Sequence, residues 1–422
     1  MRQMNNLPKI KILYIGPIPP EFGGKDSGGV ATYCYELARV AFKKGYEVYI
    51  FSNTGSLFKI EKDELIHLPI LRSVSMWLKY LYAFKAYCVY RKKIKNLTFL
   101  PFRKRMSVCY LARLFHQIIQ LLKPNLIHVL HILDNAIFSL DCIDFCPPTI
   151  VTEHGVGLLY QLEMHRWYGF KEKNHLFEAV TEASRRIHYI VSCSKFSKIA
   201  FLDVFKVPNQ VHIISILNPI NPDKIFFLEK NEAKKLCGLE DKTVLLFCGV
   251  HLPIQRKGLD ILLTAVSKDE YLRKNCKLVI VTNMEGKAYT DEFCAKQGLD
   301  GLALTSLPKE TLVKLYNAAD VFVMPSRQEG IGLVYYEALL AGTPVVGFHK
   351  SIKELEQELN IYIGEGFDAT TEGPKELAEK IKKVLNTRLE RQILRKAVIE
   401  KLSWDVKFQE YDRIYKEVLT RH

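Results

Sequence analysis

Two glutamates, Glu329 and Glu337, stand eight positions apart in the segment PSRQEGIGLVYYEALLAGTPVVG at residues 325–347. Residues 320–324 have the pattern of a buried strand, and residues 333–341 have the pattern of a helix that a Gly-Thr-Pro sequence ends. Glu329 is therefore predicted in the loop between strand and helix, and Glu337 about one turn inside the helix. Carboxylates in these places can accept hydrogen bonds from the hydroxyl groups of a ligand.

Two glycines, Gly330 and Gly332, closely follow the first of these glutamates. Glycine lets a ligand approach the backbone, and the unpaired N–H groups and the positive dipole end at a helix start attract phosphate. A diphosphate would fit there, with one carboxylate accepting hydrogen bonds from a hexose and the other from a ribose. Each glutamate alone is equally well a solvated residue. The combination indicates a site for a sugar nucleotide.

The segment closely resembles the signature of glycosyltransferase family 4, in which two glutamates are separated by seven residues. Members of that family are retaining enzymes with the GT-B fold. The resemblance implies that Glu329 contacts the donor hexose and that Glu337 holds the ribose. It also implies that the diphosphate binds to the backbone amides of Gly330, Ile331, Gly332, Leu333 and Val334.

A cationic segment at residues 249–262 resembles the strand, loop and Lys-Gly helix opening of the same family. Positive charge there suits a diphosphate leaving group, because negative charge builds on its oxygen as the glycosidic bond breaks. The resemblance places Lys257 in this role, with Arg256 as a second cation. Many members have arginine directly after the glycine, whereas this chain has Val250 and His251. Either Arg256 or His251 could supply the second phosphate contact, and both could instead be solvated surface residues.

Two further motifs follow predicted strands in the first half of the chain. Gly28 and Gly29 lie between the first strand and a helical run at residues 31–42, where the family has a glycine-rich loop that reaches the donor phosphate and the acceptor. His154, in Thr-Glu-His-Gly, follows a later strand, and the family has a histidine beside the donor sugar in this context. A structural turn and a structural histidine are the alternatives, and the neighbouring Glu153 could be structural too.

The elements that must position these residues form two alternating sets of strands and helices, which predicts two doubly wound, Rossmann-like α/β domains with a cleft between them. Strands are predicted at 10–15, 47–51, 126–130, 149–152, 189–192, 211–216, 243–248, 277–281, 320–324 and 344–346. A proline-rich break begins at Asn218. It divides an acceptor-side domain at residues 1–217 from a nucleotide-sugar-binding domain at 218–403. The amphipathic tail, about 404–422, resembles the GT-B helix that packs back on the first domain.

Composition excludes several classes of protein. The 422 residues are 48% hydrophobic and 25% charged, as in soluble globular proteins, and no apolar run reaches the roughly eighteen residues of a membrane span. A signal peptide is not recognisable, and the ten scattered cysteines suit a reducing cytoplasm. The chain has no D-x-D or His/Asp metal cluster, no G-x-G-x-x-G dinucleotide motif and no G-x-S-x-G serine elbow.

These observations predict a retaining, metal-independent hexosyltransferase that needs no cofactor. Its donor would be a nucleotide diphosphate sugar, and its acceptor a glycan or lipid-linked glycan in cell-surface polysaccharide synthesis. The sugar, base, acceptor and linkage stay open. A GT-B nucleotide-sugar epimerase or other donor-processing relative is the alternative. The basic charge alone would also suit a nucleic-acid binder, but no recognition motif accompanies it, so no nucleic-acid partner is predicted.

The net charge of +14 is concentrated at residues 72–123, and no acidic residue occurs between Glu64 and Asp134. The basic residues of this segment are Arg72, Lys79, Lys85, Arg91, Lys92, Lys93, Lys95, Arg103, Lys104, Arg105, Arg113 and Lys123. Aromatic residues are interleaved with them, a mixture that suits anionic headgroups and the membrane interface. We therefore expect a peripheral protein on the inner face of the cytoplasmic membrane. The alternative is a pair of ordinary helices with core aromatics and solvated cations.

Overall fold

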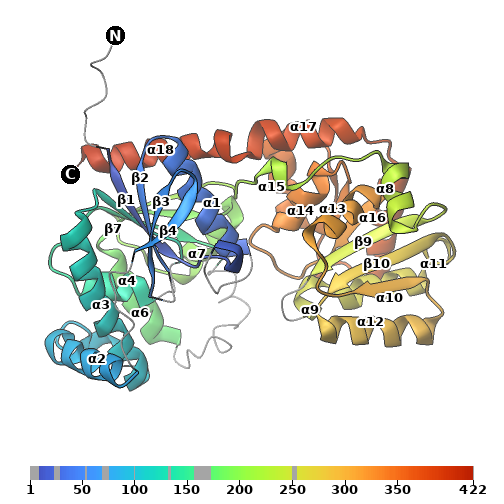
Figure 1. Cartoon of the computed structure of the whole chain (residues 1–422). Coiled ribbons are helices and arrows are strands. Elements are labelled where there is room, and N and C mark those ends of the chain that lie inside the picture. The colour runs from blue at the N-terminus through green and yellow to red at the C-terminus, as the bar shows by residue number, and fades with distance from the viewer. Residues whose placement is uncertain are drawn as a thin grey trace, which may run out of the picture. The chain divides into compact units, whose positions relative to one another are not determined.

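The computed structural model describes residues 9–22, 29–52, 55–68, 76–98, 100–131, 135–155, 173–249 and 254–421. The chain divides into two compact units. The first contains residues 1–219 and 407–422, and the second contains residues 220–406. Each unit is an open sheet with helices packed on it (Figure 1).

The first unit contains an eight-stranded sheet in the order β4-β3-β2-β1-β5-β6-β7-β8. From β2 to β8 along this order, neighbouring strands are parallel. The chain moves from β1 to β2 on one side and later to β5 on the other, so the order reverses between β1 and β5. The strands are β1 (Lys11–Gly16), β2 (Glu47–Ser52), β3 (Leu57–Glu61), β4 (Glu64–Leu68), β5 (Leu126–Val129), β6 (Thr149–Glu153), β7 (Ile187–Ser192) and β8 (His212–Ser215).

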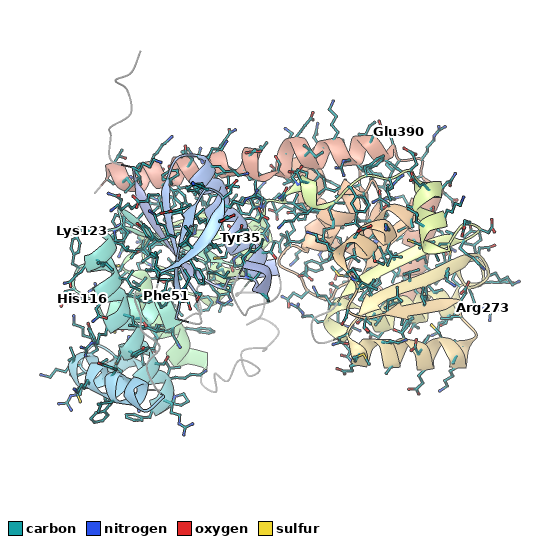
Figure 2. All side chains as sticks on the ribbon, in the orientation of Figure 1. Tyr35, Phe51, His116, Lys123, Arg273 and Glu390 are labelled. Atoms are coloured by element: carbon teal, nitrogen blue, oxygen red, sulfur yellow. The ribbon has the colours of Figure 1, made fainter. Side chains whose placement is uncertain are left out.

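Helices bury the faces of this sheet. Phe51 on β2 meets Phe115 on α3 edge to face, with ring centroids 5.3 Å apart, and both side chains are fully buried. Figure 2 shows Phe51 inside the unit. It shows His116, which follows Phe115 on α3, at the surface. The unit's helices are α1 (Gly29–Lys43), α2 (Met76–Tyr90), α3 (Phe102–Leu122), α4 (Asn135–Asp141), α6 (Lys173–Ser184), α7 (Lys195–Val204) and most of α18 (Trp404–Thr420).

Helix α18 begins in the second unit and belongs to the first from Lys407 onward. It packs on the first unit through Phe408, Tyr411, Tyr415 and Val418, which are all buried. Their spacing of three or four residues places them on one face of the helix. The amphipathic tail of the sequence is therefore a helix.

The second unit contains a six-stranded, fully parallel sheet in the order β11-β10-β9-β12-β13-β14. The chain leaves β9 for β10 on one side and later returns to β12 on the other, so the order reverses between β9 and β12. Ligands of such sheets bind at the carboxyl ends of strands where the order reverses. The strands are β9 (Thr243–Gly249), β10 (Cys276–Thr282), β11 (Gly301–Leu304), β12 (Val321–Met324), β13 (Val345–Phe348) and β14 (Gly364–Phe367).

Ten helices connect or flank these strands within the described part of the second unit. They are α8 (Lys230–Cys237), α9 (Ile254–Lys257), α10 (Leu259–Lys268), α11 (Glu270–Asn275), α12 (Met284–Gln297), α13 (Lys309–Ala318), α14 (Leu333–Leu340), α15 (His349–Leu359), α16 (Pro374–Asn386) and α17 (Arg391–Leu402).

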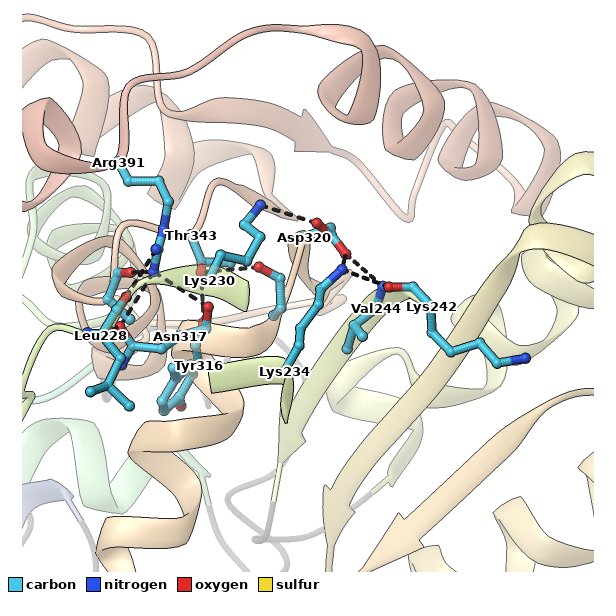
Figure 3. Close-up of polar contacts among 12 residues, drawn as sticks. Leu228, Lys230, Lys234, Lys242, Val244, Tyr316, Asn317, Asp320, Thr343 and Arg391 are labelled. Carbon is cyan, nitrogen blue, oxygen red and sulfur yellow. Dashed lines mark hydrogen bonds and ion pairs between the residues drawn. The ribbon is translucent and has the colours of Figure 1, made fainter. Parts of the chain in front are cut away.

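A polar cluster fixes helices at the amino ends of β9 and β12 (Figure 3). Asp320, just before β12, accepts hydrogen bonds from Lys234 Nζ at 2.7 Å, from Lys230 Nζ at 3.0 Å and from the Val244 amide at 2.8 Å. Arg391 of α17 donates to the Leu228 carbonyl at 2.9 Å and to the Ala341 carbonyl at 2.7 Å. This cluster therefore holds α8 and α17 at the end of the sheet opposite to the carboxyl ends of the strands.

The predicted fold of two doubly wound α/β sheets is confirmed, with corrections at the sheet edges. In the second sheet the edge strands β11 and β14 were not predicted. Strands β3 and β4 form an antiparallel hairpin at the edge of the first sheet, where the sequence had indicated no strand. Their turn residues, Lys62 and Asp63, have φ values of 50° and 64°. This left-handed turn lacks the Asn-Gly or Asp-Gly pair that makes hairpins recognisable.

Candidate functional site

Two charged residues from different loops meet where the order of the second sheet reverses. Lys257 is the last residue of α9, in the connection after β9, and Glu329 lies in the loop between β12 and α14. Their ammonium and carboxylate groups form an ion pair, with side chains only 14% and 12% exposed. The adjacent ends of β9 and β12 thus bring together residues that are 72 positions apart in sequence.

Positive charge dominates around this ion pair. Burial by itself would raise the pKa of Glu329, but Lys257 and Arg256 hold that pKa below its ordinary value. The carboxylate is therefore ionised at neutral pH, and the two cations exceed its charge. Arg256 Nε is buried with no hydrogen-bond partner among the residues that the structure describes. Such an arrangement suits a polyanion such as a diphosphate.

The two loops that carry the ion pair are clamped to each other. The Arg327 amide donates to the Arg256 carbonyl at 2.9 Å. The Arg327 guanidinium binds both carboxylate oxygens of Asp260 on α10, at 2.9 and 2.7 Å. Gly258 has a φ of 76°, and a Cβ there would lie 2.0 Å from the Pro325 carbonyl oxygen. Only glycine permits this close approach of the two loops.

Helix α14 carries the second glutamate. Glu337 Oε2 accepts a hydrogen bond of 2.8 Å from the Tyr316 hydroxyl, and burial raises the pKa of Glu337 above its ordinary value. At the start of the helix, Gly332 is the N-cap and makes no side-chain capping hydrogen bond, and the first turn contains no acidic residue. The start of α14 thus has no capping side chain at Gly332 and no acidic residue in its first turn, as anion binding at a helix start requires.

Tyr335 fixes α14 to the sheet. Its hydroxyl donates to the Met324 carbonyl at 2.9 Å and accepts from the Phe348 amide at 3.0 Å. The ring occupies the space beside Gly347, where a Cβ would lie 2.4 Å from a ring carbon. The helix start is therefore tied to both β12 and β13.

His154 lies in the first unit, directly after β6. Burial, with a smaller effect of nearby His131, lowers its pKa to about 3, although a hydrogen bond with the Leu130 backbone acts in the opposite direction. The imidazole is therefore neutral near pH 7. Its Nε2 is buried and has no hydrogen-bond partner in the described part of the chain. The ring packs edge to face on Tyr33, with centroids 4.9 Å apart.

The other residues predicted for the site are divided between described and undescribed parts. Gly28 and His251 lie outside the described residues, and Gly29 is the exposed first residue of α1. The amides predicted to bind diphosphate lie in the loop before α14 and in its first turn, at residues 330–334. Ile331 and Gly332 are buried there, and Gly330, Leu333 and Val334 are partly exposed.

Two family models match the chain. The model described as Glycosyltransferase Family 4 matches residues 27–224, and the model described as Glycosyl transferases group 1 matches residues 242–387. Together they cover about four fifths of the chain and include every residue predicted for the site. The chain is a glycosyltransferase of the family 4 type.

Relatives of this family 4 protein share both sequence and fold. An uncharacterized glycosyltransferase of Methanocaldococcus jannaschii is 31% identical over 54% of this chain. The matched region covers 59% of that relative's length. The sucrose-phosphate synthase of Thermosynechococcus elongatus has a TM-score of 0.72 at 16% identity, over 98% of the chain and 100% of that structure. Anabaena HepE, solved in complex with UDP-glucose, has a TM-score of 0.64 at 17% identity, with coverage of 98% and 100%. The fold is thus that of the GT-B glycosyltransferases.

Other residues support the side chains that were predicted for the site. Glu153 is fully buried and accepts hydrogen bonds from the Gly155 amide at 2.8 Å, from the Ser197 hydroxyl at 2.9 Å and from the Ser192 hydroxyl. These contacts fix the turn that carries His154. Tyr33, Tyr316 and Arg327 were not predicted, because their partners lie far away in the sequence. The Thr-Glu-His-Gly motif was the only available pointer to Glu153.

Proposed function

We propose that this protein is a retaining hexosyltransferase that uses a nucleotide diphosphate sugar as donor and a glycan or lipid-linked glycan as acceptor. The observation that carries the proposal is the Lys257–Glu329 pair beside the start of α14, in the unit whose sheet order reverses at that point. Family membership and the likeness to HepE, a protein solved with UDP-glucose, support a sugar-nucleotide donor.

In this proposal the diphosphate lies against the first amides of α14 and the cations Lys257 and Arg256. Lys257 exchanges its partner in the donor-free protein, Glu329, for a phosphate oxygen. Glu329 then accepts hydrogen bonds from hydroxyls of the hexose, and Glu337 accepts them from the ribose. The donor is thereby held at three points, which fixes the anomeric carbon relative to the acceptor.

The reaction breaks the bond between the anomeric carbon and the diphosphate oxygen. The electron pair stays on that oxygen, where Lys257, Arg256 and the helix start stabilise the charge. The acceptor hydroxyl forms the new bond on the same face of the sugar, and its proton passes to the departing phosphate. This same-face course follows from family membership, and it needs no separate protein base.

A thermal-shift screen of nucleotide sugars tests the donor proposal, because a ligand that binds only the folded protein raises its melting temperature. The donor found in this way is then incubated with candidate acceptors, with and without EDTA. We expect transfer that EDTA does not abolish, since the side-chain cations can neutralise the diphosphate. Loss of transfer on chelation that manganese restores would contradict the metal-independent mechanism.

A nucleotide-sugar epimerase is the alternative within the same fold. It would convert the donor without an acceptor, whereas a transferase consumes donor at a useful rate only when acceptor is present. Incubation with donor alone, followed by chromatography of the sugar nucleotide, separates the two functions.

We also propose that α2 and the start of α3 bind the anionic inner surface of the cytoplasmic membrane. The outer face of α2 exposes Leu81, Phe84 and Val89, with relative exposures of 49%, 53% and 68%. Three or four residues separate Leu81, Phe84 and Cys88, so an apolar stripe runs along the helix. Among the described residues, no helix has both the length and the apolar character to cross a membrane.

Basic side chains surround this stripe. Lys85, Arg91, Lys92, Lys93 and Arg103 are exposed. An exposed aromatic and aliphatic stripe flanked by cations is typical of helices that lie in the interface of an anionic bilayer. Other aromatic residues of the segment pack against the core, namely Tyr87, Tyr90 and Tyr110. For these residues the alternative prediction, that the aromatics fill the core, is confirmed.

A further inference from the structure

A buried hydrogen-bonded cluster links helix α18 to the turn that carries His154. Its members come from β1, α1, β5 and α18, and at most 3% of each is exposed. We call it the tyrosine cluster, and it consists of Tyr14, Tyr33, His128, Tyr411 and Tyr415.

The cluster has two branches, which start one helical turn apart on α18. In the first branch, the Tyr415 hydroxyl bonds to His128 Nδ1 at 2.8 Å and to the Tyr14 hydroxyl at 3.1 Å. His128 Nε2 in turn bonds to the Thr152 hydroxyl at 2.8 Å. This branch connects α18 to β1, β5 and β6, and the Thr152 hydroxyl at its end is also hydrogen-bonded to the Tyr33 hydroxyl.

The second branch reaches His154. The Tyr411 hydroxyl is hydrogen-bonded to the Tyr33 hydroxyl, and the Tyr33 ring meets the His154 ring at a centroid distance of 4.9 Å and an interplanar angle of 81°. This edge-to-face geometry is a preferred arrangement of aromatic rings. A tyrosine held at its hydroxyl end by α18 thus presents its ring to the imidazole.

The imidazole needs such a support. One ring nitrogen of His154 hydrogen-bonds with the Leu130 backbone, and Nε2 has no partner among the described residues. A neutral imidazole whose first nitrogen donates a hydrogen bond offers the second as an acceptor, for example to a hydroxyl of a sugar. The direction of that lone pair depends on the plane of the ring, which the Tyr33 ring restricts.

We propose that Tyr33 and Tyr411 are positioning residues, which fix the imidazole plane of His154 and with it the direction of the Nε2 lone pair. The consequence for catalysis rests on the function proposed above. The consequence for the His154 ring holds in the donor-free protein and does not depend on that function. In this way the C-terminal helix, through a single hydroxyl, acts on a residue of the first sheet.

The test compares Tyr411→Phe with Tyr415→Phe. Each substitution removes one buried hydroxyl from the same helix and keeps the ring, so both variants should fold and lose similar thermal stability. The first readout is the ¹³C-HSQC spectrum of histidine-labelled donor-free protein, with the His154 signal assigned through His154→Gln. The second readout is kcat and donor KM for transfer.

Tyr411→Phe should shift the His154 signal and lower kcat about fivefold with little change in KM, because the ring is displaced without loss of donor contacts. Tyr33→Phe, which removes the other hydroxyl of the pair, should do the same. Tyr415→Phe should shift the His128 signal and leave His154 and kcat nearly unchanged.

An unchanged His154 signal in Tyr411→Phe would overturn the proposal, and so would an equal fall in kcat in Tyr415→Phe. Full activity of His154→Gln would contradict the proposed role of His154 in transfer. In that event the spectra alone would still decide whether Tyr411 positions the ring.

Discussion

The Lys257–Glu329 ion pair combines two roles that single substitutions can separate. In the donor-free protein the two largely buried charges compensate each other. During transfer both side chains would contact the donor. Lys257→Ala and Glu329→Ala should each lower kcat at least about a hundredfold, as expected for loss of a contact made in the transition state. Steady-state kinetics on folded, purified variants measures this, and near-normal turnover would remove the residue from the mechanism.

The same pair predicts a pattern in stability. Lys257→Met leaves Glu329 with Arg256 as its remaining cation and should lower the free energy of unfolding by about 2 kcal/mol, less than for a fully uncompensated buried charge. The double variant Lys257→Met/Glu329→Met should be more stable than this single variant, because the buried carboxylate is no longer present. Denaturant unfolding of the three proteins would show it. A double variant that is less stable than Lys257→Met would mean that the pair does not act as a compensated unit.

Glu337 predicts a conflict between stability and binding. Because its pKa is raised in the folded protein above the ordinary value of 4.5, the folded state binds more protons than the unfolded state just above pH 4.5. Its contribution to stability is therefore full below that pH and is lost as pH rises through the folded pKa. Glu337→Gln should thus raise the apparent melting temperature at pH 7 by about 2 °C.

The difference between the two proteins should shrink as pH falls toward 4.5, since protonation of Glu337 removes the buried charge from the folded protein. The same variant should bind the nucleotide about tenfold more weakly, because it lacks a charged acceptor for the ribose hydroxyls. Thermal shift and calorimetry, each with and without nucleotide, measure both effects. A lower melting temperature at pH 7 would show that Tyr316 compensates the ionised carboxylate fully.

At the level of elements, the clamp formed by Arg327 and Asp260 holds two loops in register. Arg327→Ala and Asp260→Ala should each lower kcat/KM about tenfold, and the double variant should lose little more, because both changes break the same contact. Arg327→Lys should recover only part of the activity, since lysine cannot bind both carboxylate oxygens. Measurement of kcat/KM for the unaltered protein, the two single variants and the double variant tests this prediction.

The exposed pair of Lys287 and Asp291 on α12 provides the matched control for the clamp. It has the same charges in the same unit, but it lies one helical turn apart on a single helix and joins no loops. Lys287→Ala should change kcat/KM less than twofold, as expected for a surface ion pair. Strictly additive losses in the Arg327 and Asp260 variants would contradict the clamp.

The sequence predicted those elements whose signals are local. The parallel strands carry continuous apolar runs, and the helix predicted at residues 333–341 is observed as α14 at Leu333–Leu340. The hairpin of β3 and β4 was missed because its turn, at Lys62 and Asp63, carries no glycine or asparagine. In the site, residue types and spacing identified Glu329 and Lys257, but not their ion pair. That contact depends on the order of strands, which no local pattern encodes.

Contacts between distant segments could not be predicted, because no local sequence pattern encodes them. Tyr33 occupies an ordinary buried position of an amphipathic helix, and only the packing of α18 shows that its hydroxyl is bonded to Tyr411. Arg327 resembled one more surface cation until its partner on α10 was seen. Residues that position others thus need the fold, whereas residues that contact the ligand can be predicted from motifs.

On the scale of the whole molecule, the uneven charge makes a prediction about location. Phe84→Ser/Lys85→Glu should weaken binding to anionic liposomes at least tenfold, because burial of a phenylalanine contributes about 2 kcal/mol and each cation about 1 kcal/mol at an anionic surface. Cosedimentation with anionic and neutral vesicles, at low and high salt, measures the effect. Binding by the unaltered protein should require anionic lipid and should fall as salt rises.

Ile199→Ser is the matched control. Ile199 is exposed to a similar extent, 60% against 53% for Phe84, but it lies on α7 and outside the basic segment. It should bind vesicles like the unaltered protein. The apolar stripe on α2 could also be covered by a second copy of the chain, in which case light scattering would show a dimer that Phe84→Ser/Lys85→Glu dissociates. Vesicle binding that is absent, or that does not depend on lipid charge and salt, would contradict the membrane proposal. Together with such a dimer, it would assign the exposed stripe to self-association.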